Sequence, residues 1–250
     1  MANQHKNGLL VSMFLFTLGV LLLPFISSCG KGANANPAGL NTQLQILNLS
    51  PDAQPLNLWL NFVRESQTIY SYPTSSGYFF ISTLQGPLQM RLSTNAATPV
   101  LTVDTPAYPP LKANSKYTLF ITGFKSDNTI KNSILSLDTV TLPANGRGKV
   151  RFVHASPTSP ELDLWANGTE VTDKLAFNKL SPYVQLPAGN YIFTVNVHTT
   201  PTKVEATTPV FTIQDGRAYT VYTQGIVGRT DSLAFSINVL TNNLLLKPGQ

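Results

Sequence analysis

The chain has 250 residues, of which 42% are hydrophobic and only 12% are charged, about half the charged share usual in soluble proteins. This composition is too apolar for a disordered chain and too polar for a protein that crosses a membrane many times. The net charge of +5 comes from scattered Lys and Arg residues that form no basic patch, so no nucleic-acid partner is expected.

The first 28 residues have the layout of a secretory signal peptide. Lys6 precedes an uncharged run from Leu9 to Ile26, whose length lies at the lower limit for a transmembrane helix. The run ends at the start of the segment Ile26-Ser27-Ser28-Cys29-Gly30, which resembles the lipobox of bacterial lipoproteins. This resemblance implies cleavage after Ser28 and a lipid on Cys29. An uncleaved anchor helix with an incidental cysteine is the alternative.

Cys29 is the only cysteine, which excludes an intramolecular disulfide and a cysteine-based zinc site. Lipid on this thiol would make the membrane the first partner of the protein. Gly30 resembles the signal for an outer-membrane destination, but no acidic export run follows, so the side of the membrane stays open. Residues 29–42 are small and polar and are expected to form a flexible tether.

An internal repeat organises the remaining residues. Three segments recur in order at offsets of 106, 106 and 102 residues: Ile46–Pro51 as Phe152–Pro157, Leu56–Asn61 as Leu162–Asn167, and Lys116–Gly123 as Ala218–Gly225. Because order and spacing persist over about a hundred residues, the pattern predicts a tandem domain duplication and not a solenoid. We define the first repeat as residues 43–145 and the second as residues 146–250, with a turn-forming stretch, Pro143–Gly146, between them.

Each repeat is rich in short segments with apolar residues at every second position, which is typical of β-strands. The clearest are Leu88–Leu92, Tyr117–Ile121, Ile134–Val140, Tyr191–Val197, Ala218–Gln224 and Leu233–Val239. The segments ending in Tyr117 and Tyr219 resemble tyrosine corners, and Asn167-Gly168 favours a hairpin turn. We therefore predict an all-β chain of two tandem Ig-like Greek-key β-sandwich domains.

Three segments of the second repeat carry a family resemblance: Val150–Pro157, Leu162–Gly168 and Leu186–Tyr191. They are similar to the domain-of-unknown-function family 4397 of bacterial envelope proteins. The first repeat is a divergent copy, in which Asn48 replaces His154 and Asn57 replaces Asp163. The resemblance implies an envelope location and this fold, but no established activity.

The residues that could carry chemistry form no catalytic or metal-binding motif. His154 is expected to be hydrogen-bonded in a turn, and no zinc spacing surrounds it or His198. Glu161 and Asp163 could hold a cation, but without a calcium-loop pattern they are expected to be solvated. Gly146–Lys149 lacks the context of a phosphate loop and is interpreted as a linker. We expect no catalytic residue, no metal site and no cofactor.

The two tryptophans occupy matching positions in the repeats. If Leu56, Leu58 and Leu60 face the core, strand alternation places Asn57 and Trp59 on the outer face, and likewise Asp163 and Trp165 in the second repeat. Each pair, Asn57 with Trp59 and Asp163 with Trp165, could form a platform on which a sugar ring stacks, so the chain would carry two such platforms. Alternatively, the rings are covered by a loop or by the other repeat.

Two triplets, Asp138-Thr139-Val140 and Asp231-Ser232-Leu233, resemble sites at which some bacterial envelope proteins carry O-glycans. The leading functional hypothesis is a non-enzymatic, lipid-anchored envelope protein that serves as a binding or scaffolding module of unknown ligand, with envelope glycans or envelope proteins as candidate partners. The second is a glycan-binding lipoprotein that uses Trp59 and Trp165. The third is a hydrolase whose activity would depend on His154, although the motifs required are missing.

Overall fold

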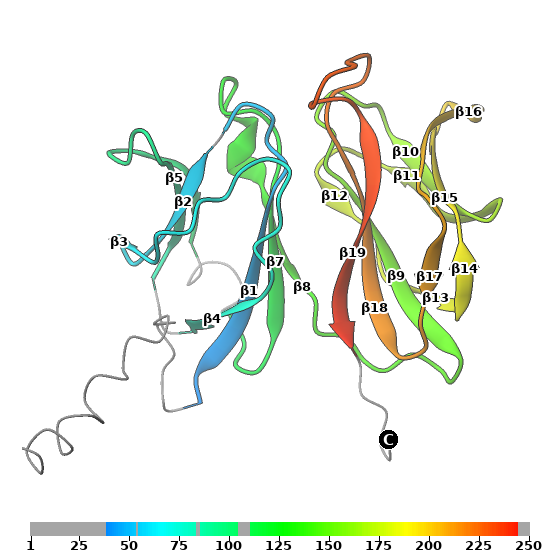
Figure 1. Cartoon of the computed structure of the whole chain (residues 1–250), viewed down its shortest axis with the longest axis horizontal. Helices are drawn as coiled ribbons and strands as arrows, with labels where there is room; N and C mark the ends of the chain where they lie inside the picture. Colours follow the sequence, from blue (N-terminus) through cyan, green and yellow to red (C-terminus); the bar gives the residue numbers. More distant parts are fainter. Residues whose placement is uncertain (1–38, 54, 84–85, 105–110, 245–250) are drawn as a thin grey trace, which may run out of the picture.

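The computed structural model describes residues 39–244 except residues 54, 84–85 and 105–110 (Figure 1). The predicted signal peptide, Cys29 and most of the predicted tether therefore lie outside the described residues. The prediction of an all-β fold is confirmed: strands form two β-sandwiches side by side, and the one regular helical element among the described residues is the short 3₁₀ helix η2 (Thr129–Asn132).

The first sandwich consists of two four-stranded sheets. The sheet that faces the second sandwich, here called the first inner sheet, has the order β4 (Phe79–Ser82), β1 (Asn41–Asn48), β7 (Lys116–Ile121), β8 (Ile134–Leu137). The first outer sheet has the order β3 (Val63–Arg64), β2 (Leu56–Leu60), β5 (Leu88–Leu92), β6 (Pro99–Val103).

The second sandwich repeats this arrangement. Its inner sheet has the order β12 (Lys179–Leu180), β9 (Arg147–His154), β18 (Arg217–Gln224), β19 (Ser236–Leu244), with β13 (Val184–Pro187) also paired to β9. Its outer sheet has the order β11 (Thr169–Leu175), β10 (Leu162–Ala166), β15 (Phe193–Val197), β16 (Thr200–Thr207). A small pair, β14 (Gly189–Tyr191) and β17 (Phe211–Ile213), completes it.

Matching strands of the two repeats pair in the same way. In each inner sheet the first strand pairs in parallel with a strand from late in the repeat, β1 with β7 and β9 with β18, while the other ladders are antiparallel. A parallel pair between strands so distant in sequence requires a crossover between the two sheets. The shared topology agrees with the duplication seen in the sequence.

The predicted turn chemistry is confirmed. The Tyr219 hydroxyl accepts a hydrogen bond from the backbone N–H of Gln214, and the Tyr117 hydroxyl accepts one from Lys112, each at 3.0 Å. Asn167 and Gly168 have φ angles of 47° and 78°, the left-handed values that a tight two-residue hairpin requires.

The interpretation of Gly146–Lys149 as a linker is wrong beyond Gly146, because β9 begins at Arg147. Packing explains why this strand has a glycine at position 148. A Cβ atom on Gly148 would lie 2.5 Å from Cγ2 of Ile213 and 3.0 Å from the carbonyl oxygen of Gln214, so only glycine allows this approach.

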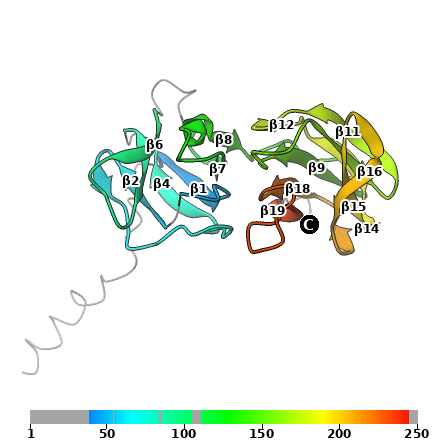
Figure 2. The ribbon, with the colours of Figure 1, turned by 90° about the horizontal axis from the view of Figure 1, so that it is seen from above.

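Each sandwich has its own core, and a third apolar cluster lies between them. Along β1, Leu44 and Ile46 point into the first core, whereas Leu47 points to the second repeat. The inner sheets are therefore covered on both faces, and the view from above shows them facing each other across the junction (Figure 2). Within the described residues, no helix is long and apolar enough to cross a membrane.

Candidate functional site

The junction between the repeats is built from matching positions of the two copies. Its buried apolar side chains are Leu47, Leu49, Phe120 and Ile134 of the first repeat and Val153, Ala155 and Tyr222 of the second. Leu47, Leu49 and Phe120 correspond to Val153, Ala155 and Tyr222 at the offsets of 106 and 102 found in the sequence. Apolar burial on this scale favours association of the two sandwiches into one body.

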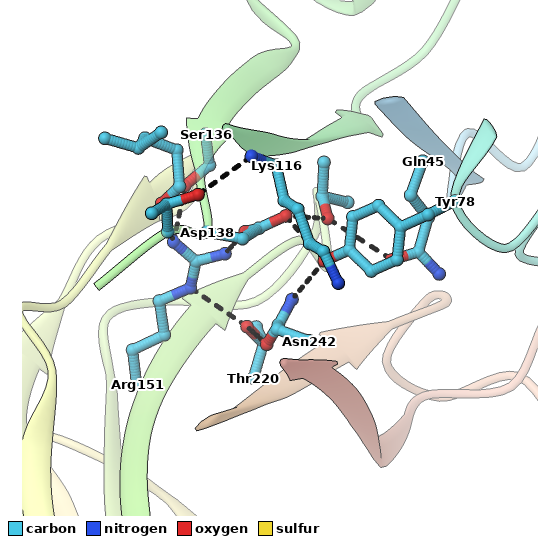
Figure 3. Close-up of polar contacts among 11 residues, drawn as sticks. Gln45, Tyr78, Lys116, Ser136, Asp138, Arg151, Thr220 and Asn242 are labelled. Atoms are coloured by element: carbon cyan, nitrogen blue, oxygen red, sulfur yellow. Dashed lines mark hydrogen bonds and ion pairs between the residues drawn. The ribbon is translucent and has the colours of Figure 1, made fainter. Parts of the chain in front are cut away.

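A buried polar network borders this apolar cluster (Figure 3). The guanidinium of Arg151, on β9, forms an ion pair with Asp138, which follows β8 of the first repeat, and both side chains are almost completely inaccessible. Arg151 also donates to the hydroxyls of Ser136 and, at 2.9 Å, Thr220. The Asp138 carboxylate accepts from the hydroxyls of Thr118, at 2.6 Å, and Tyr78, at 2.9 Å.

The hydrogen bonds around this ion pair compensate for its loss of water. Burial raises the pKa of the Asp138 carboxyl, while Arg151 and the hydroxyls of Thr118 and Tyr78 oppose that shift. Burial likewise raises the pKa of the Tyr78 hydroxyl, which keeps it a proton donor to Asp138. In the Asp138-Thr139-Val140 triplet the Asp138 side chain is buried in the junction, whereas Thr139, the residue that would carry an O-glycan, is exposed.

Beside the junction, the two repeats line a cleft of about 950 Å³. Its walls are residues 102–104 at and just after the end of β6, the segment around η2, and residues 177–179, which lead into β12. Asn178 connects the walls, because its side chain accepts a hydrogen bond from the Thr122 hydroxyl at 2.6 Å and donates to the carbonyl oxygen of Asn132.

The cleft contains one aromatic side chain among polar and charged groups. Phe177 is partly buried and packs edge-on against the His154 ring, with the ring centres 6.0 Å apart. Lys131 and Lys179 contribute positive charge, and Asp104 contributes a carboxylate. Sequence reasoning missed this cleft, since no local motif brings η2 of one repeat next to Phe177 of the other.

The expected platform of the first repeat is largely covered. Leu56, Leu58 and Leu60 do face the core, but Asn57 on the opposite face is only 3% exposed. Its side-chain oxygen accepts a hydrogen bond from Arg64 at 3.0 Å. The partly buried ring of Trp59 has the guanidinium of Arg91 stacked 4.5 Å from its centre. The expectation that this face is open to solvent is therefore wrong for Asn57, because the side chain of Arg64 lies against it.

The second repeat places Asp163 and Trp165 on its own outer sheet, so the structure does not bring the four platform residues together. Asp163 is also only 3% exposed, and its carboxylate accepts from the backbone N–H of Lys174 at 2.8 Å. The expectation of a solvated Asp163 is wrong, because the chain of β11 folds over it. Trp165 is partly buried, and no cation–π contact covers its ring among the described residues.

His154 is hydrogen-bonded near a turn, as predicted. Its Nε2 atom lies 2.9 Å from the carbonyl oxygen of Pro160, and the side chain is fully buried. Burial lowers the pKa of His154 to about 4. A histidine in this position stays neutral at physiological pH and cannot reach a substrate in solvent.

Comparisons with known proteins give a family but no activity. A family model described as a domain of unknown function, DUF4397, matches residues 42–164 and residues 148–245. No curated protein matches the chain. A crystal structure of a protein from Bacteroides eggerthii, provisionally described as a cell adhesion protein, is 11% identical with a TM-score of 0.20, over 84% of this chain and 98% of that chain. At these values the likeness assigns no function.

Proposed function

The chain belongs to the DUF4397 family of domains of unknown function, and on that premise we propose that it is a lipid-anchored, non-enzymatic binding module of the cell envelope. The observation that carries this proposal is the cleft formed jointly by the two repeats, held in place by the buried Arg151–Asp138 pair. A rigid, preformed cleft suits binding because little ordering is needed when a ligand enters.

The chemistry of the cleft favours a polar ligand with negative charge. Five of its eleven lining residues carry a hydroxyl or an amide, two lysines outweigh one carboxylate, and Phe177 offers an apolar ring surface. Sugars combine hydroxyl groups with apolar ring faces, so an acidic envelope oligosaccharide fits this set of groups best. Catalysis receives less support, because the histidine nearest the cleft, His154, is buried and neutral.

Titration calorimetry with acidic and neutral oligosaccharides tests the ligand. We expect saturable binding of the acidic compounds and a loss of about tenfold or more in the Lys131→Ala/Lys179→Ala variant, since each lysine supplies charge to the cleft. Lys112→Ala, an exposed lysine outside the cleft, is the matched control and should bind like the wild type. Equal affinity in both variants would place the ligand elsewhere.

A second experiment tests the anchor independently of any ligand. In the expressing bacterium, the wild-type protein is expected to incorporate an alkyne-labelled fatty acid and to sediment with membranes, whereas Cys29→Ala should do neither. Protease treatment of intact cells then determines which side of the outer membrane carries the protein. A Cys29→Ala protein that still sediments with membranes would contradict the lipid anchor.

Glycan binding at the tryptophans is the second candidate function. The observation that favours it applies to Trp165, whose ring is partly exposed and has no cation stacked on it, in contrast to Trp59 below Arg91. A Trp165→Ala variant that keeps its stability but loses glycan binding would support this candidate. Loss of binding in the Lys131→Ala/Lys179→Ala variant alone would exclude it.

A further inference from the structure

Three side chains with metal-binding atoms meet on the outer sheet of the second repeat, away from the cleft and the junction. They are Asp163 on β10, Asp173 on β11 and His198 directly after β15. The His198 Nδ1 atom lies 3.0 Å from Oδ1 of Asp163 and 3.1 Å from Oδ1 of Asp173. All three atoms lie within 4.8 Å of one another.

Within the described residues, His198 is the only side chain that forms an ion pair with the carboxylates of this cluster, and it carries a charge only when it is protonated. In the part of the chain that the structure describes, no Lys or Arg side chain pairs with Asp163 or Asp173, and His198 is their shared partner. The side chain of Asp163 is only 4% exposed. A buried carboxylate beside a second carboxylate is costly unless a cation compensates for it.

The first repeat shows a cation at the equivalent place. There Asn57 occupies the position of Asp163, and the guanidinium of Arg64 lies against its side-chain oxygen. Arg64 pairs with Trp59 across β2 and β3, as Glu170 pairs with Trp165 across β10 and β11, so Arg64 and Glu170 are equivalent in register. The first repeat thus has an amide in contact with a permanently charged arginine, whereas the second has two carboxylates that share one histidine.

The distances suit a small ion. Zinc ligands lie at about 2.0–2.2 Å in tetrahedral geometry, which places neighbouring ligand atoms about 3.3–3.6 Å apart. His198 Nδ1 already lies within a few tenths of an ångström of that separation from both carboxylates. The side chains of His198 and Asp173 are 32% and 62% exposed, which leaves a route for the ion and space for a water ligand.

We propose that Asp163, Asp173 and His198 form a binding site for a divalent transition-metal ion of the Zn²⁺ type, present in the second repeat and replaced by Arg64 in the first. One imidazole with two carboxylates is a ligand set for zinc and similar ions. Calcium requires six to eight oxygen ligands, and this cluster does not provide them.

Titration calorimetry with ZnCl₂ tests the site. The protein is the full chain with Cys29→Ser and no polyhistidine tag, so that neither a thiol nor a tag binds the ion. We expect one zinc per chain and a rise in Tm with zinc, because an ion that binds only the folded state stabilises it. Binding should be weaker by more than about tenfold in Asp173→Asn and His198→Ala, since each removes one of three ligands. CaCl₂ should give no comparable binding.

Glu170→Gln is the matched control, because it removes an exposed carboxylate from the same sheet outside the cluster. It should bind zinc like the parent protein. Equal zinc affinity in Asp173→Asn, His198→Ala and the parent would overturn the proposal, as would absence of binding in the parent or calcium binding of equal strength. Asp173 is mostly exposed, so its variant is expected to fold and keeps the test decisive.

A transplant of the first-repeat arrangement provides a second test. The Asp163→Asn/Glu170→Arg variant places an amide and an arginine where the first repeat has Asn57 and Arg64. We expect this variant to lose zinc binding and the zinc-dependent rise in Tm, while its Tm without zinc equals or exceeds that of the parent. Retained zinc binding would overturn the assignment of Asp163 as a ligand.

Discussion

At the scale of single residues, His154 shows how burial fixes a protonation state. The ring is enclosed by Pro160, Phe177 and Thr223, and burial lowers the pKa of His154 from 6.5 to about 4. Its counterpart in the first repeat, Asn48, fills the same role with an amide that donates to the carbonyl oxygens of Ala53 and Tyr70. At this buried position the second repeat therefore has a titratable group that the first repeat lacks.

This difference predicts an acid sensitivity that belongs to the second repeat. Between pH 6.5 and 4 the unfolded chain takes up a proton at position 154 that the folded chain does not, so the free energy of unfolding falls as the pH falls. Above pH 6.5 His154 is neutral in both states and the free energy of unfolding is unaffected. By pH 4 the uptake of a proton by the unfolded chain lowers the free energy of unfolding by about 3 kcal/mol. Urea unfolding of the wild type and His154→Asn at both pH values measures it. An unchanged pH dependence in the variant would contradict the prediction.

At the scale of structural elements, the tyrosine corners stabilise both crossovers in the same way. Tyr219 and Tyr117 are buried, and each hydroxyl accepts one backbone hydrogen bond at 3.0 Å. We expect Tyr219→Phe and Tyr117→Phe each to lower the free energy of unfolding by about 1 kcal/mol, since the ring still packs but one bond is lost. Chemical denaturation of both variants and of the double variant tests this. The two losses should add, because the corners share no contact.

The strands and turns could be predicted from the alternation of apolar residues and from the residue types at the turns. Leu56, Leu58 and Leu60 face the core as expected, and Asn167-Gly168 forms the expected hairpin turn. The limits of β9 were not predictable, because Gly148 marks a close approach to Ile213 that appears only when distant strands pair. The sandwich fold thus follows from local patterns, whereas the tight contacts within it depend on the tertiary arrangement.

The candidate sites depend even more on long-range register. Asp163 was recognised as a polar residue on the outer face, but its position beside His198 requires the pairing of β10 with β15. Asp173 joins them through an irregularity in the ladder between β10 and β11, which no sequence period indicates. The cleft around Phe177 similarly requires that the two repeats pack together, and alternation within one repeat carries no information about that contact.

At the scale of the whole molecule, the Arg151–Asp138 pair connects the two sandwiches. Asp138→Asn would leave the Arg151 guanidinium buried without a carboxylate, and we expect it to lower the free energy of unfolding by about 3–5 kcal/mol. Asp138→Leu/Arg151→Met removes both charges and should recover most of that loss. Chemical denaturation provides the measurement. Arg229→Ala, which breaks an exposed ion pair, is the control and should cause no measurable change.

The ion pair also determines which copies of the fold can associate. The network gives the first repeat Gln45, Thr118 and Asp138, and it gives the second Arg151, Thr220 and Asn242 at the corresponding places. Two first repeats brought together would enclose a carboxylate without a cation, and two second repeats would enclose a guanidinium without an anion.

Only unlike repeats satisfy each other, and the short connection between β8 and β9 keeps them at high effective concentration within one chain. This arrangement discourages self-association through the inner sheets. Even at high concentration the protein should therefore remain monomeric, with the outer faces and the cleft of each chain free for other partners.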